Sequence, residues 1–228
     1  MDRLEIIQTL MKKKKLNNYL EIGVFNGHIF FRIKSTFKVA VDPEFRFDAS
    51  RKAGKTLVNP YNLYNQYYSK TSDAFFAEDA TDVFNDKEVE ISLIDGMHEY
   101  AYALRDIENT VKYLSDDGVI VVHDCSPKDK EAEVNFAEYE KRGFTGIWNG
   151  DVWKAILHIR SIRKDLTAFV LDTDQGLGII TKKPDHNNSL RFTQEQIGGF
   201  TFEDLDKNRK EWLDLRPETD FYDHFDIK

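Results

Sequence analysis

The sequence predicts an α/β fold in which a mostly parallel, seven-stranded, Rossmann-like sheet carries helices on both faces. Short apolar runs alternate with helical patterns along much of the chain, which is typical of strand–helix–strand units. The first clear run, at residues 19–24, leads directly into a glycine turn. Two late runs are joined only by the short polar segment 172–177, and a connection that short predicts an antiparallel hairpin.

Each element follows from a local pattern. An amphipathic stretch (Leu4, Ile7, Leu10, Met11) precedes Lys12–Lys15, and these lysines are expected at a solvated helix end. The clearest helix covers residues 100–114, where apolar residues recur at steps of three and four. Residues 43–65 are polar, lack helical periodicity and are expected to form a long loop. A last helix is predicted over 202–213. The predicted strands are 19–24, 38–41, 66–69, 89–94, 118–122, 166–171 and 178–181.

Composition limits the classes of function. With 228 residues the chain is expected to be one domain, with a core at about 16–182 and a C-terminal extension at 184–228. Because 40 acidic residues outnumber 32 basic ones, the net charge of −8 argues against a nucleic-acid partner. Cys125 is the single cysteine, which excludes an internal disulfide. No signal peptide or membrane-spanning run is recognised, so a cytoplasmic location is expected.

The glycine turn predicts a nucleotide-like ligand. Glu21 lies inside the apolar strand, and a buried carboxylate there is costly unless a ligand or a donor meets it. Gly23 and Gly27 allow close backbone approach, and Asn26 lies between them. A nicotinamide fingerprint would require glycines where Phe25 and His28 stand. The remaining alternative is a tight strand-to-helix turn with no ligand.

Two further residues are candidates for the same ligand. Asp42 ends the second strand about 20 positions after the glycine turn, where a carboxylate suits a ribose diol. The alternative is that Asp42-Pro43 forms a strand-end turn. Ser72 follows the third strand, and together with Asp73 it is interpreted either as a helix cap or as an adenine contact.

The ends of the fourth and fifth strands carry reactive side chains. If these strands are neighbours, Asp95 and Asp124 lie close together, and two carboxylates at that distance favour a shared proton or cation. We therefore predict a divalent metal site with oxygen ligands, the alternative being two turn caps. His98 is a candidate general base. His123 is a doubtful ligand because Mg²⁺ prefers oxygen, and a position behind the ligands or facing substrate is favoured.

These residues resemble a known family. Ile-Asp95-Gly-x-His98-x-Tyr and Gly-Val-Ile-Val-Val-His123-Asp124, with a helix between them, look like the class I S-adenosylmethionine-dependent methyltransferases of the macrocin O-methyltransferase and cephalosporin-hydroxylase-like group. Five mostly parallel strands followed by a hairpin are the strand arrangement of that fold. The resemblance covers roughly residues 16–182, and Gly150-Asp-Val-Trp-Lys-Ala155 adds a weaker likeness to members from sugar clusters.

The resemblance implies a division of roles. Glu21, Gly23 and Gly27 would hold the methionine part of S-adenosylmethionine, and Asp42 its ribose. Asp95 and Asp124 would bind Mg²⁺ or another divalent metal, and His98 would act as general base. Similar sugar O-methyltransferases often carry an acid where this chain has His123.

The function expected from this reading is metal-assisted O-methylation of a hydroxylated small molecule such as a sugar or sugar conjugate. Trp148, Trp153, Tyr100 and residues 43–65 are candidates to flank that acceptor, although Trp153 is better suited to the core. The alternatives are a metal-independent N- or O-methyltransferase and a non-catalytic cofactor-binding module. The acceptor's identity and a homo-oligomeric state are left open.

Overall fold

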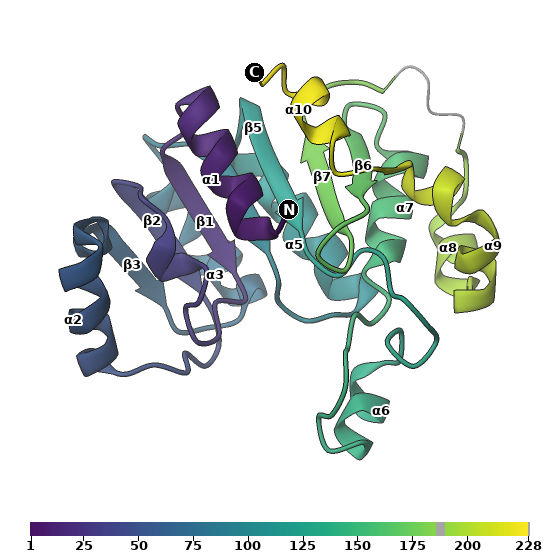
Figure 1. Ribbon diagram of the computed structural model, residues 1–228, viewed down its shortest axis with the longest axis horizontal. Helices are drawn as coiled ribbons and strands as arrows, with labels where there is room; N and C mark the ends of the chain where they lie inside the picture. The colour runs from purple at the N-terminus through teal and green to yellow at the C-terminus, as the bar shows by residue number, and fades with distance from the viewer. Residues whose placement is uncertain (186–189, 228) are drawn as a thin grey trace.

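The computed structural model describes residues 1–185 and 190–227 of the chain. Within these residues, eight strands form one sheet in the order β3-β2-β1-β4-β5-β7-β6-β8 (Figure 1). The strands are β1 (Asn18–Ile22), β2 (Phe37–Val41), β3 (Asn65–Tyr68), β4 (Val89–Ile94), β5 (Leu114–Val122), β6 (Thr167–Leu171), β7 (Leu177–Thr181) and β8 (Leu215–Arg216).

The pairing confirms the predicted topology. The first five strands are parallel to one another, whereas β7 is antiparallel to both β5 and β6. The seven predicted strands all form, within a few residues at their ends. The eighth, β8, is two residues long and pairs with β6, and so short a strand leaves no alternating pattern in the sequence.

The helices alternate with the strands and lie on both faces of the sheet (Figure 1). They are α1 (Arg3–Lys14), α2 (Ala49–Val58), α3 (Ser72–Glu78), α4 (Ala80–Val83), α5 (Tyr100–Tyr113), α6 (Phe136–Lys141), α7 (Trp153–Ile162), α8 (Gln194–Gly199), α9 (Phe202–Leu213) and α10 (Asp220–His224), with 3₁₀ turns η1 (Phe30–Arg32) and η2 (Pro60–Tyr64).

The predicted long loop at residues 43–65 is wrong, because α2 and η2 occupy most of it. Asp48 caps α2 by accepting a hydrogen bond from the backbone N–H of Arg51 at 2.8 Å. All ten residues of α2 are partly or fully exposed, so the helix adds no buried side chain to the core.

Alternating strand residues build a core on each face of the sheet. In β5, Val119 and Val121 pack with α1, whereas Ile120 and Val122 pack with α5 and α7. Trp153 lies fully buried in the second of these layers, as expected. Within the described part of the chain, no helix combines the length and the apolar character needed to cross a bilayer.

Candidate functional site

The carboxyl ends of β1, β2 and β4 open onto a hollow of about 810 Å³. Parallel strands present their following loops at one edge of a sheet, so segments distant in sequence meet here. The hollow is lined by all three ligand-binding regions that the sequence predicts: the turn after β1, the end of β2 with the start of α3, and the segment after β4.

The glycine turn has a shape that only glycine permits. Gly23 has φ +82°, and a Cβ atom there would lie 1.9 Å from the carbonyl oxygen of Asp95. Gly27 has φ +72° and packs against the ring of Phe31, so it supports the turn from behind. Asn26 lines the hollow, and its Oδ1 accepts a hydrogen bond from the N–H of His28 at 2.9 Å.

Glu21 lies beneath this turn and is 2 % exposed. Burial raises the pKa of Glu21 to about 8, although the hydrogen bond from the Tyr19 hydroxyl opposes that effect. The donor that a buried carboxylate needs is therefore supplied partly by Tyr19. Glu21 still contributes to the wall of the hollow, where a further donor can reach it.

Asp42 both lines the hollow and closes the local turn. Its Oδ2 accepts from the N–H of Phe25 and its Oδ1 from the N–H of Glu44, each at 2.7 Å. The two interpretations of Asp42 are thus compatible, because each carboxylate oxygen has lone pairs left for another donor.

The start of α3 differs from the expectation. Thr71, and not Ser72 or Asp73, is the cap, and its hydroxyl accepts from the N–H of Ala74 at 3.3 Å. Ser72 lines the hollow, and so does Asp106, a residue of α5 that the sequence did not indicate. Asp106 lies within the apolar stripe of an amphipathic helix, where a single acidic residue gives no sequence signal of its own.

Asp106 links folding stability to pH. Burial raises the pKa of Asp106 to about 7, although the bond from Ser72 opposes it. Because folding favours the protonated form, this stabilisation is complete below about pH 4, the unfolded value, and is lost as the pH rises toward 7. Between pH 5 and pH 8, denaturant titration should show the wild type losing roughly 2–3 kcal/mol more than Asp106→Asn. Parallel losses in the two proteins would contradict this assignment.

Three predicted side chains converge at the ends of β4 and β5. Ligand atoms of Asp95, His98 and Asp124 all lie within 4.8 Å of one another. His98 Nε2 is 3.5 Å from Asp95 Oδ1, and His98 Nδ1 is 3.3 Å from Asp124 Oδ2. Asp124 has φ +63°, an uncommon conformation for a residue other than glycine that often marks a functional site.

His123 contacts the same two carboxylate oxygens as His98, namely Asp95 Oδ1 and Asp124 Oδ2. Its Nδ1 is 2.9 Å from Asp124 and 3.3 Å from Asp95, and its Nε2 faces Asp174 at 3.4 Å. Burial alone would lower the pKa of His123, but the hydrogen bonds that it makes to these three carboxylates raise it to about 11. Its Nε2 also lies 2.7 Å from Nη1 of Arg3, so both ring nitrogens have partners within the protein.

Arg3 and Asp174 complete the charge balance, and neither was predicted. Arg3, from α1, contacts Asp174 at 2.9 Å and Asp95 at 3.5 Å. Burial alone would raise the pKa of Asp95, but hydrogen bonds from His123 and His98 hold it well below its usual range. Arg3 starts a helix near the N-terminus and Asp174 lies in the β6–β7 turn, so no short motif connects them to Asp95.

An aromatic wall adjoins His98. The imidazole stacks on Trp148 with ring centroids 4.6 Å apart, and Trp148 stacks in turn on Tyr139 at 4.7 Å. His98 Nδ1 donates to the Trp148 carbonyl at 2.7 Å, which leaves Nε2 as the basic nitrogen. Asn149 donates to Asp124 Oδ1 at 2.7 Å. Of the predicted acceptor-flanking residues, Trp148 therefore lies at the site.

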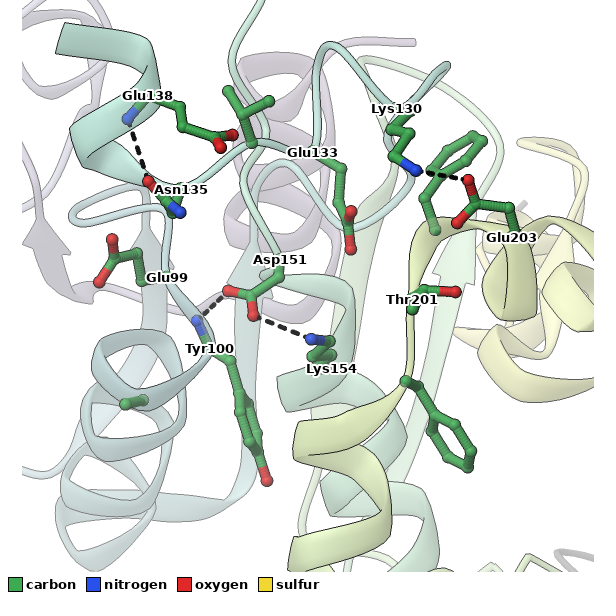
Figure 2. A pocket seen from close by; sticks show the side chains of 14 residues that line it. Glu99, Tyr100, Lys130, Glu133, Asn135, Glu138, Asp151, Lys154, Thr201 and Glu203 are labelled. Carbon is green, nitrogen blue, oxygen red and sulfur yellow. Dashed lines mark hydrogen bonds and ion pairs between the residues drawn. The ribbon is translucent and has the colours of Figure 1, made fainter. Parts of the chain in front are cut away.

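A second hollow of about 550 Å³ lies on the other side of the segment after β4 (Figure 2). Tyr100 belongs to this one, and its hydroxyl is bonded to His158 Nδ1 at 2.7 Å. Asp151 accepts from the N–H of Tyr100 at 2.6 Å and pairs with Lys154 at 3.2 Å. These bonds fix residues 148–151 against the start of α5, and thus hold the aromatic wall in place.

The Asp95, His98 and Asp124 cluster has a donor set that fits a divalent cation. Two carboxylates and one imidazole suit Mn²⁺ or Fe²⁺ as well as Mg²⁺ with added water ligands. The strained backbone of Asp124 and the bond from Asn149 hold one carboxylate facing His98.

The comparisons with known proteins agree with this geometry. A family model described as a methyltransferase domain matches residues 20–125, from β1 to the residue after Asp124. None of the curated protein sequences matches the chain. The match includes the glycine turn, Asp42, Ser72 and the Asp95–His98–Asp124 cluster, but not Arg3 or the aromatic wall.

Solved structures share the fold at low sequence identity. The O-methyltransferase TomG from Streptomyces achromogenes, in complex with S-adenosylmethionine, is 13% identical, with a TM-score of 0.57 over 78% of each chain. A putative O-methyltransferase from Klebsiella pneumoniae is 10% identical, with a TM-score of 0.55 over 80% of this chain and 81% of that one. A methyltransferase from Podospora anserina with bound S-adenosylhomocysteine is 14% identical, with a TM-score of 0.52 over 80% of each chain.

The sheet order, the glycine turn and the matched domain define a class of enzyme: the Rossmann-like transferases that use S-adenosylmethionine. Residues 20–125 match a methyltransferase domain, and the chain shares its fold with class I S-adenosylmethionine-dependent methyltransferases.

Proposed function

We propose that this enzyme methylates a hydroxyl group of a small molecule such as a sugar, with the help of a divalent cation, as in the macrocin O-methyltransferase-like group. The observation that carries the proposal is the convergence of Asp95, His98 and Asp124 beside the glycine turn. The three side chains provide a base and a cation site next to the place where the cofactor is expected. The fold of the O-methyltransferases named above gives independent support.

The cofactor is assigned to the larger hollow. Glu21, Gly23, Asn26 and Gly27 would form the methionine end of its site, Asp42 would bind the ribose, and Ser72 would lie toward the base. S-adenosylmethionine supplies the methyl group as a sulfonium. Asp95 lines the hollow and also belongs to the cluster with His98 and Asp124, which supports a position of the sulfonium end near His98.

His98 is the proposed general base. Its Nδ1 proton is held by the Trp148 carbonyl, so Nε2, which lies 3.5 Å from Asp95, would be the nitrogen that accepts the proton of the acceptor hydroxyl. Burial alone would lower the pKa of His98, but bonding to Asp95 and the charge of Asp124 raise it. The face of Trp148 is suited to the apolar face of a sugar ring.

A divalent cation held by Asp95, Asp124 and water would lower the pKa of a bound hydroxyl and orient it, and would leave His98 Nε2 to accept the proton. One observation favours a second candidate, a metal-independent methyltransferase. Arg3 and His123 already lie against the same carboxylates, and the charge of Arg3 balances part of theirs. Both candidates retain transfer to oxygen, and they differ in whether the cation is required.

Transfer from labelled S-adenosylmethionine to a panel of sugars and other hydroxylated acceptors tests the proposal, with and without a chelator. We expect labelled product with at least one acceptor, a loss of about 100-fold or more after chelation, and recovery on adding Mg²⁺ or Mn²⁺. Full activity after chelation would leave the metal-independent enzyme. Labelling of amines but not of hydroxyls would contradict O-methylation.

A further inference from the structure

The end of α2 and the 3₁₀ turn η2 form a corner of the molecule where apolar side chains face the solvent. α2 lies at the outer edge, beside the edge strand β3 (Figure 1). Five large apolar side chains within eight residues are each between 39% and 87% exposed, and we call them the apolar corner: Leu57, Val58, Tyr61, Leu63 and Tyr64. An exposed apolar group of this extent is typical of a surface that a partner covers.

The exposure of the corner follows from the polar residues that lie among its apolar ones. Asn59 and Asn62 take the inward positions and are buried. The Asn59 amide donates to the carbonyls of Phe31 and Ile33, each at 3.0 Å. Asn62 donates to the carbonyl of Phe31 at 3.1 Å and accepts from the buried ammonium of Lys38 at 2.7 Å. Because these bonds hold the asparagines inward, the aliphatic side chains beside them are held outward.

The surroundings of the apolar corner are basic. Residues 49–72 and residues 22–41 contain no acidic residue, although the chain carries 40 of them. The two stretches meet at the corner, because the asparagine bonds join residues 59 and 62 to residues 31 and 33. Their surface cations include Arg32, Lys34, Arg51 and Lys55. In a chain with a net charge of −8, this region is a local excess of positive charge.

Charge and shape together indicate the kind of partner. Pairing of the corner with a second copy of itself would bring one basic surface against another, which is unfavourable. An anionic surface is complementary to it. Aliphatic side chains that project from a short helix, with tyrosines beside them and cations around them, are typical of a segment that lies between lipid headgroups and acyl chains. Neither of the two hollows described above is lined by the corner, so what it offers a partner is projecting side chains.

We propose that the apolar corner docks the enzyme onto an anionic lipid surface. Leu57, Val58 and Leu63 would enter the outer acyl region, and the surrounding cations would contact the headgroups. η2 leads into the amino end of β3, which is parallel to β2, whereas the large hollow opens at the carboxyl ends of the strands. The docked enzyme would therefore keep its hollow away from the lipid. This docking is independent of the methyl transfer proposed above.

Sedimentation with vesicles tests the proposal, with phosphatidylcholine alone and with roughly one third phosphatidylglycerol added. The wild type should bind the anionic vesicles at least ~10-fold more strongly than the neutral ones, and added salt should reduce this difference. Leu57→Ser combined with Leu63→Ser removes two exposed aliphatic side chains and should weaken binding about 10-fold or more. Arg51→Glu combined with Lys55→Glu should abolish the preference for anionic lipid.

Ile162→Ser is the matched control. Ile162 is also an exposed aliphatic residue at the end of a helix, but α7 packs on β6, far from β3 in the sheet, so this variant should bind as the wild type does. A wild type that binds neither kind of vesicle would overturn the proposal and leave an acidic protein as the partner. Unchanged binding by both double variants would also overturn it.

Sedimentation velocity provides a second measurement, without lipid. The wild type should be a species that Leu57→Ser combined with Leu63→Ser leaves unchanged. A dimer that this double variant dissociates would overturn the proposal, because a second copy would then cover the corner. Neither measurement needs a cofactor or a methyl acceptor, so a failure of the docking proposal is distinguishable from a failure of the proposed function.

Discussion

Asp124→Asn is expected to reduce methyl transfer by roughly 10³-fold while leaving the fold and cofactor binding intact. Asp124 Oδ2 faces His98 and His123, and its Oδ1 accepts from Asn149. The substitution removes the charge that holds both imidazoles and any cation in the cluster. Asparagine has the same shape and tolerates the left-handed backbone at φ +63°, so the change isolates the charge.

Steady-state rates, with S-adenosylhomocysteine affinity measured separately, check this result. Asp174→Asn is a matched comparison because Asp174 also contacts His123 and also has a positive φ, of +45°, but it lies outside the three converging ligands. Its loss should be smaller, about 10-fold, through a displaced Arg3. Activity of Asp124→Asn within tenfold of the wild type would show that this carboxylate is not part of the reaction.

The strands of the sheet could be predicted from the sequence because each of the seven predicted strands is a short apolar run. Residues 38–41 and 118–122 are buried on both faces, and such runs indicate a parallel sheet before any contact is known. The proximity of Asp95 and Asp124 could be predicted from the same strands. Both lie one or two residues past the end of adjacent parallel strands, so their proximity follows from the topology.

The rest of the site depends on contacts that no local pattern encodes. Arg3 reaches Asp95 and Asp174 because α1 packs across the sheet, and Asp106 reaches Ser72 because α5 lies beside α3. The exposed helix α2 could not be predicted for a different reason. It has a side-chain cap and no buried residue, so no core contact fixes its place in the fold.

Gly150→Ala is expected to lower methyl transfer by about 100-fold, although Gly150 has no side chain that could take part in the reaction. A Cβ atom at Gly150 would lie 1.6 Å from the carbonyl oxygen of His98, so the two segments would have to separate. The bond from His98 Nδ1 to Trp148 and the bond from the Tyr100 N–H to Asp151 (Figure 2) both cross this contact. Separation would therefore break the bond that keeps the proton on His98 Nδ1, and would move the imidazole away from Asp95.

Gly146→Ala separates this effect from backbone strain. Gly146 lies in the same segment with φ +85°, compared with +58° for Gly150, and a Cβ atom there would have open space around it. Both variants bear the strain of a left-handed alanine, about 1 kcal/mol, but only Gly150→Ala meets the His98 carbonyl. We expect Gly146→Ala to retain activity within threefold. Equal losses in the two variants would mean that strain in the loop, and not the position of His98, limits the reaction.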